Sequence, residues 1–129
     1  MDNLKELYNR NRDWQFDAGA AIPVKPPLHI SAELRHRYYQ LVTDEAKEFY
    51  ESSDRANALD LTADLIIYAM SFAAECGFSA NQLTEAMQRA IAANEAKRFS
   101  DGTYHRNEYG KIIKPEGWQA PDLSDLFDN

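Results

Sequence analysis

The sequence contains a single cysteine, Cys76, so it can form neither an internal disulfide framework nor a zinc site built from cysteines. Glycine and proline are also scarce, with five of each, and this composition favours helices. No apolar stretch is long and unbroken enough to span a bilayer, and the first residues lack the pattern of a signal peptide. We therefore expect a cytoplasmic protein with no membrane partner, in which Cys76 is an inert buried thiol.

Positive charge is in short supply. The chain has 14 Lys and Arg residues against 21 Asp and Glu residues, which gives a formal net charge of −7. A protein that binds a nucleic-acid duplex presents a basic face, so this class is excluded. A phosphorylated small molecule remains compatible with the charge if metal ions bridge the two partners.

Hydrophobic periodicity and capping residues predict four helices. The first begins at Asn3, where Glu6 completes a possible capping box. Gly77 is a good residue to end the third helix, because glycine readily adopts the left-handed conformation that follows a helix. The other three helices are expected at about residues 31–52, 55–76 and 79–99.

The predicted architecture is a single all-α domain over residues 1–129, built as a four-helix bundle. At this length one domain can bury a sizeable core. Residues 1–30 form the first helix and a proline-rich loop, and residues 31–99 form a three-helix core. Residues 100–129 form a C-terminal tail of loops, in which residues 104–113 can make a short hairpin.

Four carboxylates lie where a helical protein is expected to carry apolar residues. Two are three positions apart in the second predicted helix, and two are four positions apart in the third, so each pair shares one helix face. We call them the acidic quartet: Glu45, Glu48, Asp60 and Asp64.

Two members of the acidic quartet interrupt apolar patterns. Glu45 falls on a stripe that is otherwise apolar, and Asp64 opens the most apolar run of the chain, residues 65–70. Unpaired carboxylates that face an apolar interior are costly, and few Lys or Arg residues are close in sequence. A divalent cation such as Mg²⁺ or Mn²⁺ is the leading candidate for the missing positive charge, because hard cations prefer oxygen ligands. A structural network of ion pairs is the alternative.

The third predicted helix is apolar on nearly every side, including Leu61, Ile66 and Met70. Such a helix is expected to be buried, either at the centre of the bundle or in an interface between subunits. Because a small four-helix monomer cannot cover all of these sides, we expect a homo-oligomer, at least a dimer.

Three segments carry a resemblance to a known superfamily. The acidic quartet follows the pattern E-E-x-x-E…D, with Asp44 in place of the first glutamate. Residues 93–97 are similar to an N-M-S-K stretch, and residues 110–123 to a C-terminal G-K-x-x-K…P-P-D-L pattern. Together these segments resemble the all-α nucleoside triphosphate pyrophosphohydrolases, which include the MazG proteins, the dimeric all-α dUTPases and phosphoribosyl-ATP pyrophosphohydrolase.

The resemblance implies hydrolysis of a nucleoside triphosphate or a related nucleotide to the monophosphate form and pyrophosphate. It implies that the acidic quartet holds Mg²⁺ and that one of its carboxylates orients or deprotonates the attacking water. It also implies dimers or tetramers whose active sites use more than one subunit. The residues that it assigns to the substrate, with lysines for the phosphates and an indole for the base, are Asn94, Lys97, Lys111, Lys114 and Trp118.

Plainer interpretations remain beside these assignments. A non-catalytic helical module that binds nucleotide or a partner protein is the alternative function, and the intact acidic quartet favours the enzyme. An aromatic residue in a tail more often pins the tail to the core, which is the first interpretation of Trp118. Asn94 and Lys97 are equally compatible with a surface role. Glu33 and His36 match one E-x-x-H motif of di-iron bundles, but such sites need two copies, so the histidines are expected at the surface or at caps.

Overall fold

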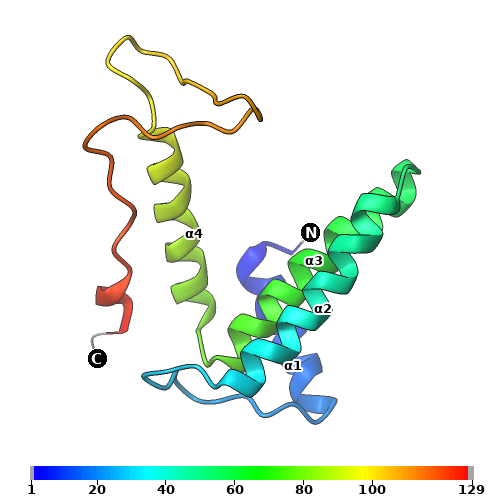
Figure 1. Ribbon diagram of the computed structural model, residues 1–129. Helices are drawn as coiled ribbons and strands as arrows, with labels where there is room; N and C mark the ends of the chain where they lie inside the picture. Colours follow the sequence, from blue (N-terminus) through cyan, green and yellow to red (C-terminus); the bar gives the residue numbers. More distant parts are fainter. Residues whose placement is uncertain (1, 128–129) are drawn as a thin grey trace. The chain divides into compact units, whose positions relative to one another are not determined.

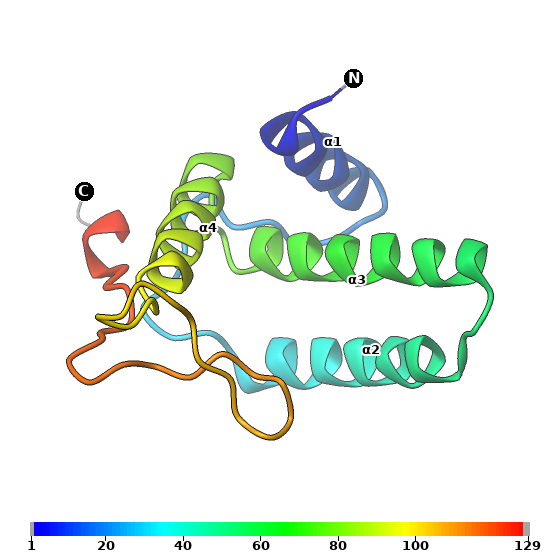
Figure 2. The same cartoon turned by 90° about the horizontal axis from the view of Figure 1, so that it is seen from above.

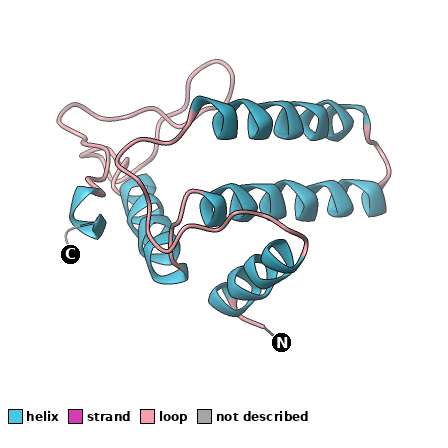
Figure 3. Cartoon of the chain, turned by 90° about the horizontal axis from the view of Figure 1, so that it is seen from below, coloured by secondary structure: helices cyan, strands magenta, loops and turns pink. Residues whose placement is uncertain are grey.

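The computed structural model describes residues 2–127, and within them the secondary structure is helical, with no β-strand (Figures 1 and 3). The all-α class is therefore confirmed. None of the helices in this range is long and apolar enough to cross a membrane. Met1, Asp128 and Asn129 lie outside the described residues, so the predicted domain of residues 1–129 is described except for these three positions. The elements are α1 (Leu4–Asp17), α2 (Ala32–Glu51), α3 (Arg55–Glu75), α4 (Ala80–Glu95) and the short 3₁₀-helix η1 (Ser124–Phe127).

The chain divides into two compact units. The first covers residues 1–81 and contains α1, α2 and α3, whereas the second covers residues 82–129 and contains most of α4, the tail and η1. The boundary falls in the first turn of α4, so the core predicted for residues 31–99 crosses it.

In the first unit, α2 and α3 form an antiparallel hairpin, and α1 packs against α3 (Figure 2). Both helices of the hairpin begin directly after a residue whose side chain caps them. The Ser31 hydroxyl accepts a hydrogen bond from the Leu34 amide at 3.1 Å, and the Asp54 carboxylate accepts one from the Ala56 amide at 2.6 Å. The three-residue turn 52–54 thus fixes where one helix ends and the next begins.

Gly77 ends the third helix as predicted, and the structure adds a steric reason for it. Its φ of +88° lies in the left-handed region that glycine adopts easily. A Cβ at this position would lie 2.7 Å from the carbonyl carbon of Lys25 and 2.8 Å from the nitrogen of Pro26. The backbone of the proline-rich loop therefore crosses the end of α3 at a distance that only glycine allows.

The core of the first unit is built mainly on α3. Tyr8 of α1 and Tyr38 of α2 pack on it, and the Tyr38 ring meets Phe72 edge to face at 5.4 Å. The Cys76 thiol is buried as expected, and burial raises its pKa to about 11. The buried apolar residues of the three helices are Tyr8, Tyr38, Leu61, Met70, Ala73 and Ala74, and Cys76, which directly follows α3, is buried as well.

Buried polar groups tie α1 and α2 to the same helix. The Gln15 amide donates to the Ser71 carbonyl oxygen at 3.1 Å. The buried Glu75 carboxylate accepts from the Tyr38 hydroxyl and, at 2.9 Å, from the Arg37 guanidinium. Because these groups satisfy one another, they can be buried at small cost.

One side of α3 is only partly covered by α1. Ile66 is 52% exposed and Ile67 is 40% exposed, whereas Met70, on the same side of the helix, is buried. An apolar groove of about 570 Å³ runs between α1 and α3 and involves these exposed residues. We call it the α1–α3 groove; it is lined by Leu7, Arg10, Asn11, Trp14, Ala63, Ile66, Ile67 and Met70.

In the second unit, α4 ends at Glu95, four residues before the predicted end at Phe99. Side chains from the tail take its last carbonyl groups: the Trp118 indole donates to the Ala93 oxygen at 2.7 Å, and the Tyr104 hydroxyl donates to the Glu95 oxygen at 2.9 Å. These bonds satisfy acceptors that a helix end leaves open, so the helix can stop without a glycine.

The tail reverses direction where the hairpin was predicted, with a single antiparallel bridge between Arg106 and Ile112 in place of paired strands. Further along, η1 is held to α4 by Arg89. The guanidinium of Arg89 donates to both carboxylate oxygens of Asp125, at 2.6 and 2.9 Å, and to the Asp122 carbonyl at 2.9 Å.

Candidate functional site

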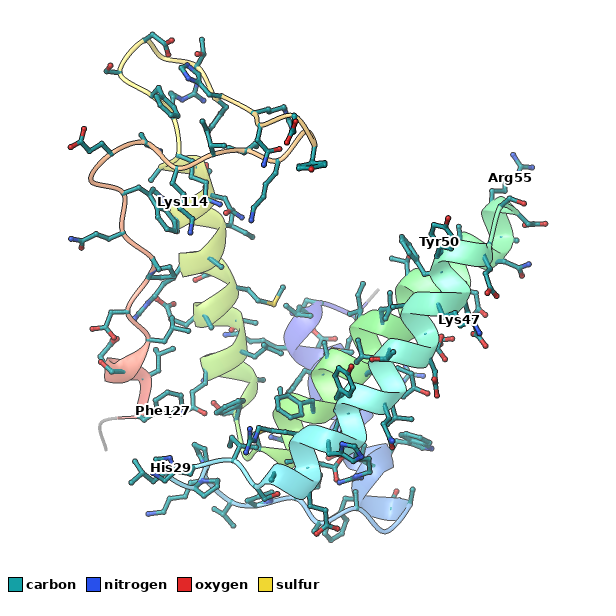
Figure 4. All side chains as sticks on the ribbon, in the orientation of Figure 1. His29, Lys47, Tyr50, Arg55, Lys114 and Phe127 are labelled. Carbon is teal, nitrogen blue, oxygen red and sulfur yellow. The ribbon has the colours of Figure 1, made fainter. Side chains whose placement is uncertain are left out.

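The acidic quartet lies on the α2–α3 hairpin, with one pair on each helix. Because the helices are antiparallel, the C-terminal half of α2, which carries Glu45 and Glu48, lies beside the N-terminal half of α3, which carries Asp60 and Asp64. Figure 4 labels Lys47, Tyr50 and Arg55 at this end of the hairpin. Glu45 and Asp64 are half-buried, and the other two acids are exposed.

Glu45 is the most constrained member of the acidic quartet. Its Oε2 atom is buried and has no hydrogen-bond partner among the described residues. Its pKa is raised, first by burial and then by the negative charges of Glu48, Asp64, Asp60 and Asp44. The fold thus brings the four predicted carboxylates within electrostatic range of one another.

No cation among residues 2–127 forms an ion pair with these acids. Lys47 and Arg55, the basic residues at this end of the hairpin, are exposed and pair with none of the four. The network of ion pairs that the sequence left open is therefore not formed in the described part of the chain.

The four carboxylates do not converge on one point in this conformation. Within residues 2–127 no three His, Cys, Asp or Glu side chains lie close enough together to hold a metal ion. A shared ion would thus require side-chain rotation. Exposed carboxylates such as Glu48 and Asp60 make such rotations rapidly and at small cost.

A polar cleft of about 310 Å³ opens next to the acidic quartet and contains residues that sequence reasoning missed. Glu51 lies three positions after Glu48, and Asn57 three positions before Asp60, so helical spacing was the signal that could have found them. The hydroxyl of Ser52 is the second buried side-chain oxygen of the described chain that lacks a partner. The cleft is lined by Glu48, Glu51, Ser52, Asn57, Asp60 and Leu61.

Tyr68 is a further neighbour of the acidic quartet, although the sequence pattern placed it in an apolar stripe. Its pKa is raised by burial and then by the charges of Glu45, Asp64, Glu48 and Asp44, so the hydroxyl keeps its proton and can donate it in a hydrogen bond. Its position one helical turn after Asp64 was the available signal. The Tyr68 ring also lines an apolar groove of about 520 Å³ between α2 and α3.

No protein-family model matches the chain, and no curated protein matches it in sequence. An assignment to a family therefore rests on the residues themselves and on the geometry given above.

The residues predicted to meet the substrate all lie in the second unit. Lys97 and Lys114 are brought together over the ring of Trp118. The Trp118 indole is hydrogen-bonded to α4, which agrees with the interpretation that this aromatic residue pins the tail. Asn94 and Lys111 are exposed, and the Lys111 amide donates to the Asn107 side chain at 3.0 Å.

The histidines are placed much as expected, because His29 and His36 are exposed. His105 is half-buried, stacks on Phe99 at 3.8 Å, and lies 3.1 Å from a carboxylate oxygen of Asp101. The pKa of Asp101 is lowered to about 2, chiefly by hydrogen bonds from Thr103 and then by His105. This group stabilises the turn after α4.

Proposed function

We propose that this chain is a Mg²⁺-dependent nucleotide pyrophosphohydrolase of the all-α type, which converts a nucleoside triphosphate or a related nucleotide to the monophosphate form and pyrophosphate. One observation carries the proposal: the buried carboxylate oxygen of Glu45, which has no hydrogen-bond partner within residues 2–127, lies among the other three carboxylates of the acidic quartet, and no ion pair of these residues compensates them. A hard divalent cation, Mg²⁺ or Mn²⁺, fits this all-oxygen donor set. The resemblance of the sequence to the superfamily supplies the reaction.

Each part of the chain has a task in this proposal. The acidic quartet holds the metal, and one of its carboxylates orients or deprotonates the attacking water. When bound, Mg²⁺ screens the phosphate charge and lowers the pKa of a coordinated water. Residues of the second unit, chiefly Asn94 and Lys97 with Lys111 and Lys114, contact the sugar and phosphates.

We also propose that the protein assembles as a homodimer or homotetramer through the α1–α3 groove. Trp14 at this groove is 63% exposed and Ile66 is 52% exposed, although both are large apolar side chains. Contiguous exposed apolar patches mark interaction surfaces, and obligate interfaces resemble a core cut in half. Lysines of the second unit then reach the acidic quartet of a neighbouring copy.

The decisive experiment is a screen of nucleoside triphosphates with pyrophosphate detection in the presence of Mg²⁺. Glu48→Gln and Asp64→Asn are each expected to lower turnover by about a hundredfold or more, because each removes a ligand charge while keeping the side-chain shape. Glu33→Gln is the matched control, since it removes a carboxylate at the opposite end of the same helix. Wild-type rates in both quartet variants at saturating metal would end the catalytic assignment, and binding without hydrolysis would favour the non-catalytic module.

A mixing experiment tests the shared site. A chain with Glu48→Gln and a chain with Lys97→Ala are each expected to be inactive alone. After mixing and reassembly as dimers, about a quarter of wild-type activity returns, because half of the dimers are mixed and one of their two sites is intact. A chain that assembles but shows no recovery would refute the shared site and leave the interface standing.

A further inference from the structure

The apolar groove between α2 and α3 opens beside the acidic quartet. Its volume of about 520 Å³ is that of a small-molecule pocket, and both of its helices belong to the first unit. We call it the α2–α3 groove. Four of the residues that line it are aromatic: Tyr38, Tyr39, Tyr68 and Phe72.

The lining of the α2–α3 groove is nearly free of charge. Among the described residues that line it, only Arg35 is charged, and its Nε donates to the Ile30 carbonyl oxygen at 3.2 Å. The same residues include no carboxylate and no amide side chain. A phosphate group therefore finds little to bind there, whereas a neutral aromatic ring finds apolar walls on which to pack.

The α2–α3 groove begins where the acidic quartet ends. In α2, Ala46 of the groove directly follows Glu45. In α3, Tyr68 lies one helical turn after Asp64, about 5.4 Å along the helix, and the charges of both acids act on its hydroxyl. The sugar of a nucleotide separates its base from its phosphates by a similar length. A nucleotide with its phosphates at the acidic quartet can thus place its base in the groove.

The tail indole, which the resemblance assigns to the base, is engaged in other contacts. Its N–H donates to the Ala93 carbonyl oxygen at 2.7 Å. The Nζ atoms of Lys97 and Lys114 lie 5.2 and 5.0 Å from the centre of the Trp118 ring, within the range of cation–π contacts. Trp118 therefore supports cations, which leaves the base to another aromatic surface.

Tyr39 is the ring of the groove that is most open to a ligand. Its side chain is 68% exposed, whereas Tyr38 is buried and donates its hydroxyl to the Glu75 carboxylate. An exposed ring at an apolar wall can stack on any base, because every base has a π-face. Apolar walls discriminate only weakly between rings, so stacking and shape decide what the groove accepts.

We propose that the α2–α3 groove binds the base of the nucleotide, with Tyr39 stacked on the ring, and accepts purines and pyrimidines alike. The inference rests on the proposed function for the position of the phosphates. It moves the base from Trp118 in the tail to the α2–α3 hairpin. A second copy of the chain is the competing occupant of an exposed apolar groove.

The test measures binding of two ligands to the full chain by calorimetry in Mg²⁺. One is α,β-methylene adenosine triphosphate, which the proposed reaction cannot cleave, and the other is inorganic tripolyphosphate, which has no base. The nucleotide is expected to bind about tenfold more tightly, and Tyr39→Ala to remove this advantage without changing the affinity for tripolyphosphate. Phe16→Ala is the matched control, because it removes a ring that is 67% exposed and lies outside the groove.

A second variant narrows the groove instead of removing a ring. Ala46→Leu adds apolar volume at an exposed helical position that tolerates leucine, and it is expected to weaken the nucleotide alone by roughly tenfold. Light scattering should give the same mass for the wild type, Tyr39→Ala and Ala46→Leu. A lower mass in either variant would assign the groove to a second copy and overturn the base site.

Two further measurements address the base itself. The uridine analogue of the nucleotide is expected to bind within about tenfold of the adenosine analogue, and a larger preference would contradict recognition by stacking. Trp118→Leu is expected to weaken the nucleotide and tripolyphosphate by the same factor, because its ring supports Lys97 and Lys114. A loss confined to the nucleotide would place the base on Trp118 and overturn the inference.

Equal affinity of the wild type for the two ligands, or wild-type affinity in both Tyr39→Ala and Ala46→Leu, would also overturn the base site. Release of pyrophosphate from adenosine triphosphate is measured separately. A chain that binds the nucleotide through Tyr39 but releases no pyrophosphate would refute the proposed function and leave the groove in place. A chain that releases pyrophosphate but binds the nucleotide independently of Tyr39 and Ala46 would keep the function and refute the groove.

Discussion

Glu45 holds a charge that the fold itself makes unfavourable, because its carboxylate is partly buried among other acids and one oxygen has no partner. The pKa is therefore higher in the folded chain than its ordinary value of 4.5. Between these two values the folded state binds more protons than the unfolded state, so the free energy of unfolding rises as the pH falls through the raised pKa, and it levels off below 4.5. Ionised Glu45 destabilises the metal-free protein at neutral pH.

The first prediction concerns Glu45→Gln. Without metal at pH 7, this variant is expected to be more stable than the wild type by roughly 1 kcal/mol, several degrees in melting temperature for a chain of this size. The difference should shrink as the pH is lowered through the raised pKa of Glu45, where the wild-type carboxylate takes up its proton. Thermal unfolding followed by circular dichroism measures both effects, and a variant less stable than the wild type at pH 7 would contradict the electrostatic argument.

The second prediction reverses the order of stability when metal is added. Saturating Mg²⁺ is expected to raise the melting temperature of the wild type, with a gain of about 2.7 kcal/mol at a hundred times its dissociation constant, and to leave Glu45→Gln nearly unchanged. The readout is the melting temperature against Mg²⁺ concentration, independent of any substrate. Equal shifts in both proteins would place the metal elsewhere.

At the scale of elements, the contact between α4 and η1 depends chiefly on Arg89, and the Gln82 side chain adds one hydrogen bond to the Leu126 carbonyl at 2.9 Å. Arg89 bonds both oxygens of Asp125, which lowers the pKa of that carboxyl, and it also pairs with Glu85 on its own helix. The lowered pKa means that the Asp125 charge and its bonds persist in mild acid and are lost only as the pH falls through that pKa.

The third prediction is that Arg89→Ala releases η1 from α4 and leaves the helices of the first unit intact. Amide exchange in residues 122–127 should become faster, because the bonds from Arg89 to Asp122 and Asp125 are gone. Arg106→Ala is the matched control, since this arginine bonds only the Gly110 carbonyl within its own loop. Unchanged exchange in residues 122–127 of the first variant would show that other contacts hold the segment.

The elements that the sequence predicted well are those whose ends are decided locally. Ser31, Asp54 and Gly77 act within three or four residues of their own positions, so the ends of α2 and α3 fall close to the predicted ranges 31–52 and 55–76. The end of α4 depends instead on Trp118 and Tyr104, which are distant in sequence, and the helix stops before the predicted residue.

The parts of the site that the sequence could not supply depend on packing between helices. Tyr68 fits an apolar stripe equally well whether it faces the core or the acids, and only the placement of α2 beside α3 decides. The two lysines over Trp118 come from separate segments, and no periodic pattern links them. Metal binding, catalysis and assembly stay predictions.

At the scale of the whole molecule, the α1–α3 groove is the feature that governs assembly. The fourth prediction is that Ile66→Glu yields a monomer, because burying a carboxylate in an apolar interface is costly. Leu28→Glu is the matched control: Leu28 is 92% exposed but lies on a loop outside the groove. Light scattering at micromolar concentration gives the mass, and a wild-type chain with a monomer mass of 14.8 kDa would refute the interface altogether.

The close crossing of residues 25 and 26 over Gly77 also bears on which sequence changes the protein can accept. At Gly110 a new side chain would meet open space, so only the positive φ opposes substitution, whereas at Gly77 the same strain is joined by contact with backbone that has little freedom to move. In a library of single substitutions selected for folded protein, position 77 should keep glycine alone, while position 110 should also accept asparagine and aspartate. The proline-rich loop thereby makes the end of α3 one of the least variable points of the chain.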